Sequence, residues 1–474
     1  MQCQPLLHIF YLSVEYSPRA RIANRESQIK YMKYHIQTYG CQMNYSDSER
    51  ITTVLEKLGY EKTDGYANAD LILLNTCSVK QNAENRIYGL GEIFAPMKEE
   101  NPNLKIGITG CMIRNESGIR GEVKHEIFRI MSTIDFVFRI KDLMHFPTIL
   151  NKLHGVGEGD DFKEILSYFH INPTIANLTQ VFVPISNGCN NFCSYCIVPY
   201  ARGREKCRSM SEILDEVQKA TKRGAREINL VGQNVSTYKP EDIDPESNES
   251  PFAQLLRKID AINSVDRIRF FTVHPKDMTD DVIDLYGELN SMVPHIHLPL
   301  QSGSETVLKR MNREYKPDRF RELVKKLRIR IPNISISTDI IVGFCGETEE
   351  EFMESCNIIK ELKIDLVYVS QYSERKGTLA EKKYEDDITP KVKKERFHYI
   401  TNLMKDISHE YNQQFKGKKV KILVERIRKG YASGKIPEFK MTRFKADDPK
   451  LIGKYVDIKV NKCMEWCLEG QPIS

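Results

Sequence analysis

Three cysteines within eight residues, Cys189, Cys193 and Cys196, form the pattern C-x3-C-x2-C and constrain this chain more than any other feature. Any fold of the chain has to present these thiols on one loop, where they can hold an iron–sulfur cluster and leave one iron without a protein ligand. Clusters that serve only electron transfer take four cysteine ligands, whereas catalytic metal centres keep one coordination position open. Zinc sites favour four ligands in two spaced pairs. The pattern therefore predicts a catalytic cluster rather than a zinc knuckle or a redox dithiol.

Length and composition indicate several domains and reduced thiols. A chain of 474 residues is long enough for about three domains, and its hydrophobic content of 41% supports buried cores. Twelve cysteines without a secretory signal favour metal binding or catalysis over disulfides. The apolar stretch Leu6–Val14 is far shorter than the ~20 residues that span a bilayer. We therefore expect a cytoplasmic protein with no membrane role.

Residues 32–150 alternate strand and helix patterns, which predicts an α/β domain with a flavodoxin-like parallel sheet. We expect its strands at Tyr34–Thr38, Leu71–Asn75, Lys105–Thr109 and Ile134–Phe138, and helices at Ser46–Leu58 and Asn82–Glu99. Residues 1–31 read poorly as structure. We expect an extension that is unstructured or not translated, with Met32 as the true start.

Each of the first three expected strands ends in a turn of small residues that carries one cysteine: Cys41, Cys77 or Cys111. The intervals of 36 and 34 residues correspond to one strand-and-helix unit each. Adjacent parallel strands deliver their carboxyl ends to the same edge of a sheet, where open α/β folds bind ligands. The sequence therefore predicts a second group of three thiols, although buried cysteines at strand ends are also common.

Residues 151–179 contain glycines and scattered acids and are expected to form a linker. Residues 180–412 carry a second strand-and-helix series, in which the cysteine pattern follows the first strand. We expect strands at Val181–Ile185, Glu227–Val231, Arg267–Thr272, His295–Pro299, Ser335–Val342 and Leu366–Ser370, with helices such as Ser211–Arg223, Arg319–Arg330 and Glu349–Leu362 between them. Six units are too few for a full eight-stranded barrel. The series predicts a partial (β/α)6 barrel with its site at the carboxyl ends of the strands.

Residues 413–474 change character after a long helix expected at Pro390–Lys416. Short strand patterns at Val420–Glu425, Ile436–Arg443 and Tyr455–Val460 predict a small antiparallel β-barrel. From Tyr411 to the last residue there are 15 Lys and Arg against 7 Asp and Glu, although the whole chain carries a net charge of only +5. Such a basic module suits nucleic-acid backbone contact, while solvated lysines alone are the alternative.

The cysteine pattern, with Tyr195 before its third member, resembles the signature of the radical S-adenosylmethionine (SAM) enzymes. Together with the remaining motifs, the chain resembles the methylthiotransferase family of these enzymes from Met32 to Ile473. The motifs are Thr38-Tyr39-Gly40-Cys41-Gln42-Met43-Asn44, Asn75-Thr76-Cys77-Ser78-Val79, Gly110-Cys111, Gly188-Cys189 to Cys196-Ile197-Val198-Pro199-Tyr200 and Arg202-Gly203-Arg204-Glu205. The final module, with Gly434-Lys435 and Gly453-Lys454-Tyr455-Val456, resembles the RNA-binding TRAM domain.

Three segments resemble the branch of the family that modifies transfer RNA at N6-isopentenyladenosine, next to the anticodon (position 37). They are Leu230–Val235, His274–Met278 and His297–Ser304. Relatives that act on threonylcarbamoyladenosine or on a ribosomal-protein aspartate differ there. Two positions depart from the family: Cys345 replaces a proline and Cys207 a serine. We expect neither thiol to be a cluster ligand.

The resemblance implies two [4Fe–4S] clusters and two SAM molecules per turnover. Cys189, Cys193 and Cys196 would hold the cluster that binds SAM and produces the radical that removes hydrogen from adenine C2. Cys41, Cys77 and Cys111 would hold an auxiliary cluster that carries sulfur. It also implies an electron donor such as flavodoxin or ferredoxin and a sulfur source. We expect a monomer.

Other site residues are expected near the carboxyl ends of the barrel strands. Candidates for binding SAM are Tyr195, Gln233, Asn234, Gln301, Asp339 and Glu347, although polar residues there often only cap turns. Arg202, Arg204 and Arg208 are expected either to meet phosphate or to pair with acids. Candidate RNA contacts in the basic module are Lys416, Lys418, Lys419, Arg428, Lys429 and Lys435. Outside the enzyme class, the alternative is a non-catalytic iron–sulfur protein that binds RNA.

Overall fold

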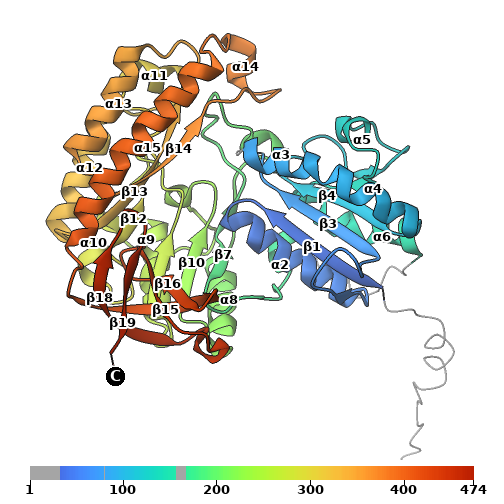
Figure 1. Cartoon of the computed structure of the whole chain (residues 1–474), viewed down its shortest axis with the longest axis horizontal. Coiled ribbons are helices and arrows are strands. Elements are labelled where there is room, and N and C mark those ends of the chain that lie inside the picture. Colours follow the sequence, from blue (N-terminus) through green and yellow to red (C-terminus); the bar gives the residue numbers. More distant parts are fainter. Residues whose placement is uncertain (1–31, 79–80, 156–166, 474) are drawn as a thin grey trace, which may run out of the picture.

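The computed structural model describes residues 32–78, 81–155 and 167–473. The described chain forms an N-terminal sheet domain, a central strand-and-helix barrel and a small C-terminal barrel (Figure 1). The expected extension at residues 1–31 lies outside the described residues, as does the part of the expected linker at residues 156–166. Within the described residues no helix is both long enough and apolar enough to cross a membrane.

The N-terminal sheet has the strand order β2-β1-β3-β4-β6-β5. Its strands are β1 (Lys33–Tyr39), β2 (Glu61–Lys62), β3 (Leu71–Thr76), β4 (Lys105–Gly110), β5 (Gly118–Ile119) and β6 (Phe136–Val137). The pairs among the first five strands of this order are parallel, and only the edge strand β5 is antiparallel. This order confirms the flavodoxin-like parallel sheet that the alternating pattern predicts.

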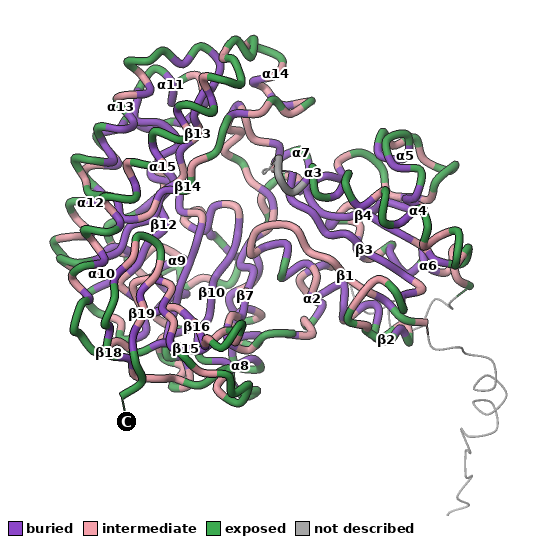
Figure 2. Tube along the Cα trace, in the orientation of Figure 1, coloured by how far each residue is buried: buried purple, intermediate pink, exposed green. Residues whose placement is uncertain are grey.

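Helices cover both faces of this sheet, so its central strands are buried (Figure 2). One face packs against α2 (Gln42–Lys57) and α6 (Phe146–His154), which follows the 3-10 turn η1 (Ile140–His145). The other face packs against α3 (Gln81–Gly89), α4 (Gly91–Glu100) and α5 (Glu126–Ile130). Strand β3 is buried along its whole length, as an inner parallel strand requires.

Two helix boundaries differ from the sequence predictions. Helix α2 starts at Gln42 rather than Ser46, because the Asn44 side chain accepts a hydrogen bond from the Cys41 backbone N–H at 3.1 Å and caps the helix there. The single helix expected at Asn82–Glu99 is two helices, α3 and α4, which are separated at Leu90. The earlier start of α2 places Cys41 at the N-cap position of that helix.

The central domain is a partial barrel of six parallel strands, which confirms the predicted (β/α)6 architecture. The strands are β7 (Val181–Pro184), β10 (Glu227–Val231), β11 (Arg267–Phe270), β12 (His295–His297), β13 (Ser335–Val342) and β14 (Leu366–Gln371). Strands β7, β10 and β11 pair in one sheet, and β12, β13 and β14 pair in another. Backbone hydrogen bonds between Ile268 and the residues Ser291 and Val293 join the two halves.

Helices on the outside of these strands enclose the largest apolar core of the molecule. They are α8 (Met210–Lys222), α9 (Pro251–Asp260), α10 (Asp280–Glu288), α11 (Glu305–Arg310), α12 (Pro317–Arg330), α13 (Glu349–Glu361) and α15 (Pro390–Gln413). The short helix α14 (Leu379–Lys383) packs through Ala380 in a separate small apolar cluster. Short 3-10 turns lie at η3 (Tyr168–His170) and η4 (Val235–Thr237). The carboxyl ends of the six strands form the mouth of the barrel.

The C-terminal strands close into a barrel in the order β15-β16-β17-β19-β18. They are β15 (Lys419–Arg428), β16 (Tyr431–Lys435), β17 (Met441–Lys445), β18 (Tyr455–Cys463) and β19 (Leu468–Pro472), with the 3-10 turn η5 (Pro449–Leu451). The strand expected at Ile436–Arg443 is confirmed only from Met441, where β17 begins. The preceding residues, between β16 and β17, form a turn, and Phe439 within it has a positive φ of 64°.

This turn seals the floor of the central barrel, at the amino ends of its strands. The Phe439 ring stacks on His295 with a centroid distance of 4.4 Å. Arg269 donates hydrogen bonds to the carbonyl oxygens of Ile436 and Pro437, and Arg267 donates to the Lys435 carbonyl. The buried Glu227 carboxylate pairs with both arginines, at 3.0 Å and 3.4 Å. The C-terminal barrel is therefore fixed to the central one by buried charges.

Replacing Glu227 with glutamine leaves two buried guanidinium groups without a compensating carboxylate. We expect Glu227→Gln to lower the free energy of unfolding by about 3 kcal/mol, the range for a broken buried ion pair. Glu361→Gln, which removes a half-exposed partner of Arg321, should cost less than about 1 kcal/mol. Thermal unfolding of both variants measures the difference, and equal shifts would contradict the role of Glu227.

Candidate active site

Three thiols meet at the carboxyl edge of the N-terminal sheet, as predicted. Cys41, Cys77 and Cys111 each follow one of three adjacent parallel strands, β1, β3 and β4. The register pairs Tyr39 with Thr76 and Thr76 with Gly110, so the three strands end level with one another. We call these three cysteines the sheet triad.

In the sheet triad, Cys77 lies within hydrogen-bonding reach of both Cys41 and Cys111. A hydrogen bond from the single S–H group of Cys77 is the largest cause of the lowered pKa of each of these two partners. The positive charge of Arg202 lowers both pKa values further. The same hydrogen bonding raises the pKa of Cys77, which is buried. These shifts thus favour the thiolate, the form in which cysteine binds metal, at Cys41 and Cys111 but not at Cys77.

Cys189, Cys193 and Cys196, which we call the loop triad, lie on one loop beyond the first barrel strand. The short strands β8 (Ser186–Asn187) and β9 (Lys206–Cys207) pair and close this loop at its base, and the helix α7 (Val198–Arg202) lies within it. Gly188 begins the loop with a φ of +86°, and a Cβ atom there would stand 2.2 Å from the Arg204 carbonyl oxygen. The loop therefore needs glycine at this position.

Polar groups from other segments approach the sulfurs of the loop triad. The Asn191 backbone N–H donates to Cys189 Sγ at 3.5 Å, and Arg313 donates to Cys193 Sγ at 3.5 Å. Burial raises the pKa of Cys196, and the negative charge of Cys111 raises it as well. The sheet triad and the loop triad are thus close enough for their charges to interact.

The donor sets of both triads fit iron–sulfur clusters, because each offers three free thiols, the type of ligand that holds such clusters. Among the described residues, no group of three or more His, Cys, Asp or Glu side chains is arranged to hold a single metal ion. A four-iron cluster makes a different demand, since its three cysteines bind three separate irons.

Buried ion pairs join the N-terminal domain, which carries the sheet triad, to the central domain, which carries the loop triad. Arg202 on α7 donates to the Asp47 carboxylate on α2 at 2.5 Å, and both side chains are buried. Glu216 on α8 accepts from Arg50 on α2 at 2.8 Å and from Arg208 at 2.7 Å. Of the two alternatives for Arg202 and Arg208, the structure therefore favours pairing with acids over phosphate contact.

The N-terminal domain also contacts the far side of the partial barrel. Arg375, which follows the last barrel strand, pairs with Glu84 at 2.6 Å. Arg114 donates to the Lys376 carbonyl. Because α2 lies against β7 (Figure 1), the N-terminal domain contacts both the first barrel strand and the segment that follows the last one.

The candidates for binding SAM differ in how free their polar groups are. The Asn234 side chain donates to Asp277 at 2.7 Å and caps η4, and the Gln301 backbone pairs with β13 in a left-handed conformation. The Asp339 side chain is 37% exposed and accepts from His297 at 3.3 Å. The side-chain amide oxygen of Gln233 (Oε1) is buried without a hydrogen-bond partner among the described residues. Gln233 and Asp339 thus keep the most capacity for a ligand.

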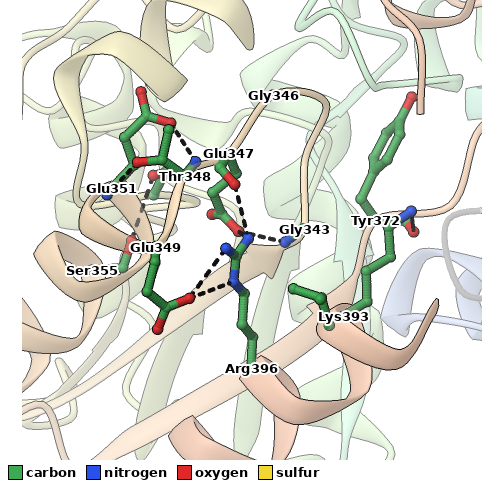
Figure 3. Close-up of polar contacts among 12 residues, drawn as sticks. Gly343, Gly346, Glu347, Thr348, Glu349, Glu351, Ser355, Tyr372, Lys393 and Arg396 are labelled. Carbon is green, nitrogen blue, oxygen red and sulfur yellow. Dashed lines mark hydrogen bonds and ion pairs between the residues drawn. The ribbon is translucent and has the colours of Figure 1, made fainter. Parts of the chain in front are cut away.

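Glu347 lies in a polar network with Gly343 and Arg396 (Figure 3). Its carboxylate accepts from the Gly343 backbone N–H at 2.6 Å and pairs with Arg396 at 2.8 Å. Desolvation raises the pKa of Glu347 to about 7. These contacts favour a role in holding the turn at Gly343–Glu347.

The remaining sequence candidates are placed as follows. Tyr195 is partly buried against Phe344, with a centroid distance of 6.4 Å. Cys207 accepts a hydrogen bond from the Lys239 backbone N–H, and Cys345 is buried with Tyr372. Neither thiol belongs to either triad.

The six candidate RNA contacts are not equally available. Lys416, Lys418, Arg428 and Lys429 are exposed on the C-terminal barrel. Lys419 pairs with Asp457 at 2.8 Å, and Lys435 pairs with Glu425 at 3.3 Å next to the floor of the central barrel.

Sequence reasoning missed Arg313, whose guanidinium reaches Cys193 from 120 residues away. Its position follows Asn312, which has a positive φ of 55° after α11. No local pattern marks such a residue, because its role depends on the barrel bringing two distant loops together.

Comparisons with known proteins agree with this arrangement. Residues 183–359 match the Radical SAM superfamily, residues 33–138 match the Uncharacterized protein family UPF0004, and residues 413–473 match the TRAM domain. The matches follow the three bodies of the fold.

Relatives along nearly the whole chain share one name, "tRNA-2-methylthio-N(6)-dimethylallyladenosine synthase". The protein of this name from Clostridium botulinum (strain Okra / Type B1) is 39% identical over 451 residues, which cover 93% of this chain and 97% of the relative. The one from Thermoanaerobacter pseudethanolicus is 39% identical over 454 residues, with 94% of each chain covered. The one from Acetivibrio thermocellus is 39% identical over 448 residues, which cover 92% and 90%.

Solved structures share the fold at low sequence identity. The radical SAM methyltransferase TsrM from Kitasatospora setae has a TM-score of 0.51 and 14% identity, covering 72% of this chain and 73% of that chain. The cobalamin-dependent SAM radical enzyme OxsB has a TM-score of 0.50 and 11% identity, covering 79% and 57%.

Replacing Gly188 tests the close packing at the base of the loop. Gly188→Ala places a Cβ against a carbonyl oxygen as well as straining the backbone, whereas Gly203→Ala, at φ +85°, meets open space. Strain alone costs about 1–3 kcal/mol. We expect the Gly188 variant to be the less stable of the two in thermal unfolding and to exchange amide hydrogens faster over residues 186–207. Equal behaviour would show that the collision is relieved without cost.

Proposed function

Because the chain belongs to the family of the tRNA-2-methylthio-N(6)-dimethylallyladenosine synthases, with a Radical SAM domain at residues 183–359, we propose that it converts N6-isopentenyladenosine next to the anticodon of transfer RNA to its 2-methylthio derivative. The observation that carries this proposal is the contact between the two cysteine segments, in which Arg202, six residues after Cys196, reaches Cys111 Sγ at 3.4 Å, in a chain 39% identical to such synthases over 93% of its length. The reaction needs a carbon radical and a sulfur donor close together, and this contact supports such an arrangement.

The loop triad is proposed to hold the cluster that binds SAM. With this group bound, SAM supplies the radical chemistry that removes the hydrogen at adenine C2. Cys189, Cys193 and Cys196 present their sulfurs from a loop that Gly188 and the β8–β9 pair hold in shape. Arg313 supplies positive charge at Cys193. Gln233, Asn234, Gln301, Asp339, Glu347 and Tyr195 remain the proposed surroundings of SAM, with Gln233 and Asp339 the least engaged.

The sheet triad is proposed to hold the auxiliary, sulfur-carrying cluster. Three thiols that follow the level ends of adjacent parallel strands, one of them in contact with the Arg202 guanidinium, support this assignment. The proposal includes two SAM molecules per turnover, an electron donor such as flavodoxin or ferredoxin, a separate sulfur source and a monomeric enzyme in the cytoplasm.

Removing one thiol from each triad separates their roles. We expect Cys193→Ala to abolish reductive cleavage of SAM, and Cys77→Ala to abolish the methylthio product while cleavage to 5′-deoxyadenosine continues. Cys207→Ser is the matched control and should keep both activities, because its sulfur only accepts a backbone hydrogen bond. Chromatography of the nucleosides and of 5′-deoxyadenosine measures both. Methylthio product from Cys77→Ala would contradict the sulfur-carrier assignment.

The acceptor is tested in cells that lack the gene. Mass spectrometry of bulk transfer RNA should show loss of 2-methylthio-N6-isopentenyladenosine and accumulation of N6-isopentenyladenosine. Loss of a methylthiolated threonylcarbamoyladenosine or ribosomal-protein aspartate would instead identify another branch of the family.

The C-terminal barrel is proposed to bind the transfer RNA backbone through its exposed cations. We expect replacement of Arg428 and Lys429 by alanine to weaken binding and to lower the slope of log affinity against log salt by about 0.7 to 0.9 per lost phosphate contact. Lys363→Ala is the control, since this exposed lysine lies on the central barrel and pairs with Glu410. Filter binding at several salt concentrations measures the slopes. Unchanged slopes in the double variant would contradict this surface.

A further inference from the structure

Arg202 lies on the loop that carries the loop triad. Its side chain contacts both Asp47 and the sulfur of Cys111, a member of the sheet triad. Arg202 is the last residue of α7, six residues after Cys196. Its partner Asp47 lies on α2, six residues after Cys41. The arginine of this ion pair therefore lies on the helix that follows the loop triad, and the aspartate lies on the helix that follows Cys41 of the sheet triad.

The contacts of the Arg202 guanidinium divide its donors between these partners. The two terminal nitrogens donate to the Asp47 carboxylate, Nη2 at 2.5 Å and Nη1 at 3.4 Å. Nη1 also donates to Asn187 Oδ1 at 3.1 Å. The Nε–H group is left for Cys111 Sγ, at 3.4 Å. Arginine can satisfy a carboxylate with its fork and still direct a third donor elsewhere, which lysine cannot do.

Burial strengthens the electrostatic effect of the Arg202 guanidinium on the Cys111 sulfur. The side chains of Arg202 and Asp47 are 3% and 0% exposed. In such a site a charged hydrogen-bond donor acts strongly on a sulfur that carries negative charge, because water does not screen it. Hydrogen bonds to the sulfurs and the net charge nearby are among the factors that set the reduction potential of an iron–sulfur cluster.

We propose that Arg202 is a positioning residue that couples the two triads: it holds the Cys111 sulfur at a fixed place relative to the loop triad and stabilises the reduced form of the cluster on the sheet triad. The inference rests on the proposed function, since it requires the sheet triad to hold a cluster. It assigns a role at the sheet triad to a residue that is not a cluster ligand and that lies in the central domain rather than in the N-terminal domain.

Arg50 provides a matched comparison within the same interface. It is also a fully buried arginine, it also joins α2 to the central domain, and it pairs with Glu216 at 2.8 Å. Its terminal nitrogens donate to Ser46 Oγ and to the Glu216 carboxylate rather than to a cysteine. Glu216 keeps Arg208 as a second partner when Arg50 is removed. A role that depends only on domain packing should therefore appear in variants of both arginines.

The test uses the full chain with Cys189, Cys193 and Cys196 replaced by alanine, so that only the sheet triad can hold a cluster after anaerobic reconstitution. Redox titration followed by electron paramagnetic resonance (EPR) then gives the reduction potential. We expect Arg202→Met to disfavour reduction about tenfold, a shift of about 59 mV to a more negative potential for one electron. Arg50→Met should leave the potential unchanged. Arg202→Lys keeps the charge, and we expect a smaller shift in the same direction; it supplies the readout if the methionine variant does not fold.

The intact enzyme gives a second readout. Arg202→Met should increase the 5′-deoxyadenosine formed per methylthio product, because the sulfur is no longer held in place, whereas Arg50→Met should not. An unchanged potential and ratio in both Arg202 variants, or equal changes in the Arg50 variant, would overturn the inference. Absence of any cluster on the sheet triad with Arg202 intact would instead overturn the proposed function, and this inference with it.

Discussion

The buried ion pair between Arg202 and Asp47 is the contact on which the arrangement of the molecule depends. It joins the loop that carries the loop triad to the first helix of the N-terminal domain, and the same guanidinium contacts Cys111 of the sheet triad. Burying two charges is costly unless they pair well and their remaining donors are satisfied. Here the carboxylate, an asparagine side chain and a sulfur satisfy the guanidinium, so the domains have one favourable relative position.

Buried ion pairs also lie at the other contacts between the three domains. Arg50, Glu216 and Arg208 extend the charged contact along α2. At the floor of the central barrel, Glu227 lies between Arg267 and Arg269, whose other donors hold the turn of the C-terminal barrel. Apolar packing builds each body, while oriented charges fix how the bodies sit together. The C-terminal barrel is thus anchored below the mouth, and its exposed cations reach outward from a rigid base.

Strand periodicity and the spacing of cysteines were enough to predict both sheets and both triads. The sheet triad could be predicted because parallel strands joined by helices of similar length must end at one edge, which the register of β1, β3 and β4 confirms. Contacts between distant segments could not be predicted. Arg202 and Asp47 are 155 residues apart, and only the docking of two folded domains brings them together. Glu347 lies at a strand end, as expected of a cofactor residue, but Arg396 on α15 engages it. The first part of the strand expected at Ile436–Arg443 is a turn, in which Phe439 has a left-handed conformation and stacks on His295 at the floor of the barrel.

The central claim is that two cluster-binding triads face each other across one fixed domain boundary. EPR spectroscopy of the fully reduced, reconstituted enzyme tests it most directly, because two paramagnetic clusters close together interact magnetically. The account predicts a spectrum broadened by this interaction, which becomes sharp when the cysteines of either triad are replaced by alanine. A spectrum of one cluster alone, or of two clusters that do not influence each other, would contradict it.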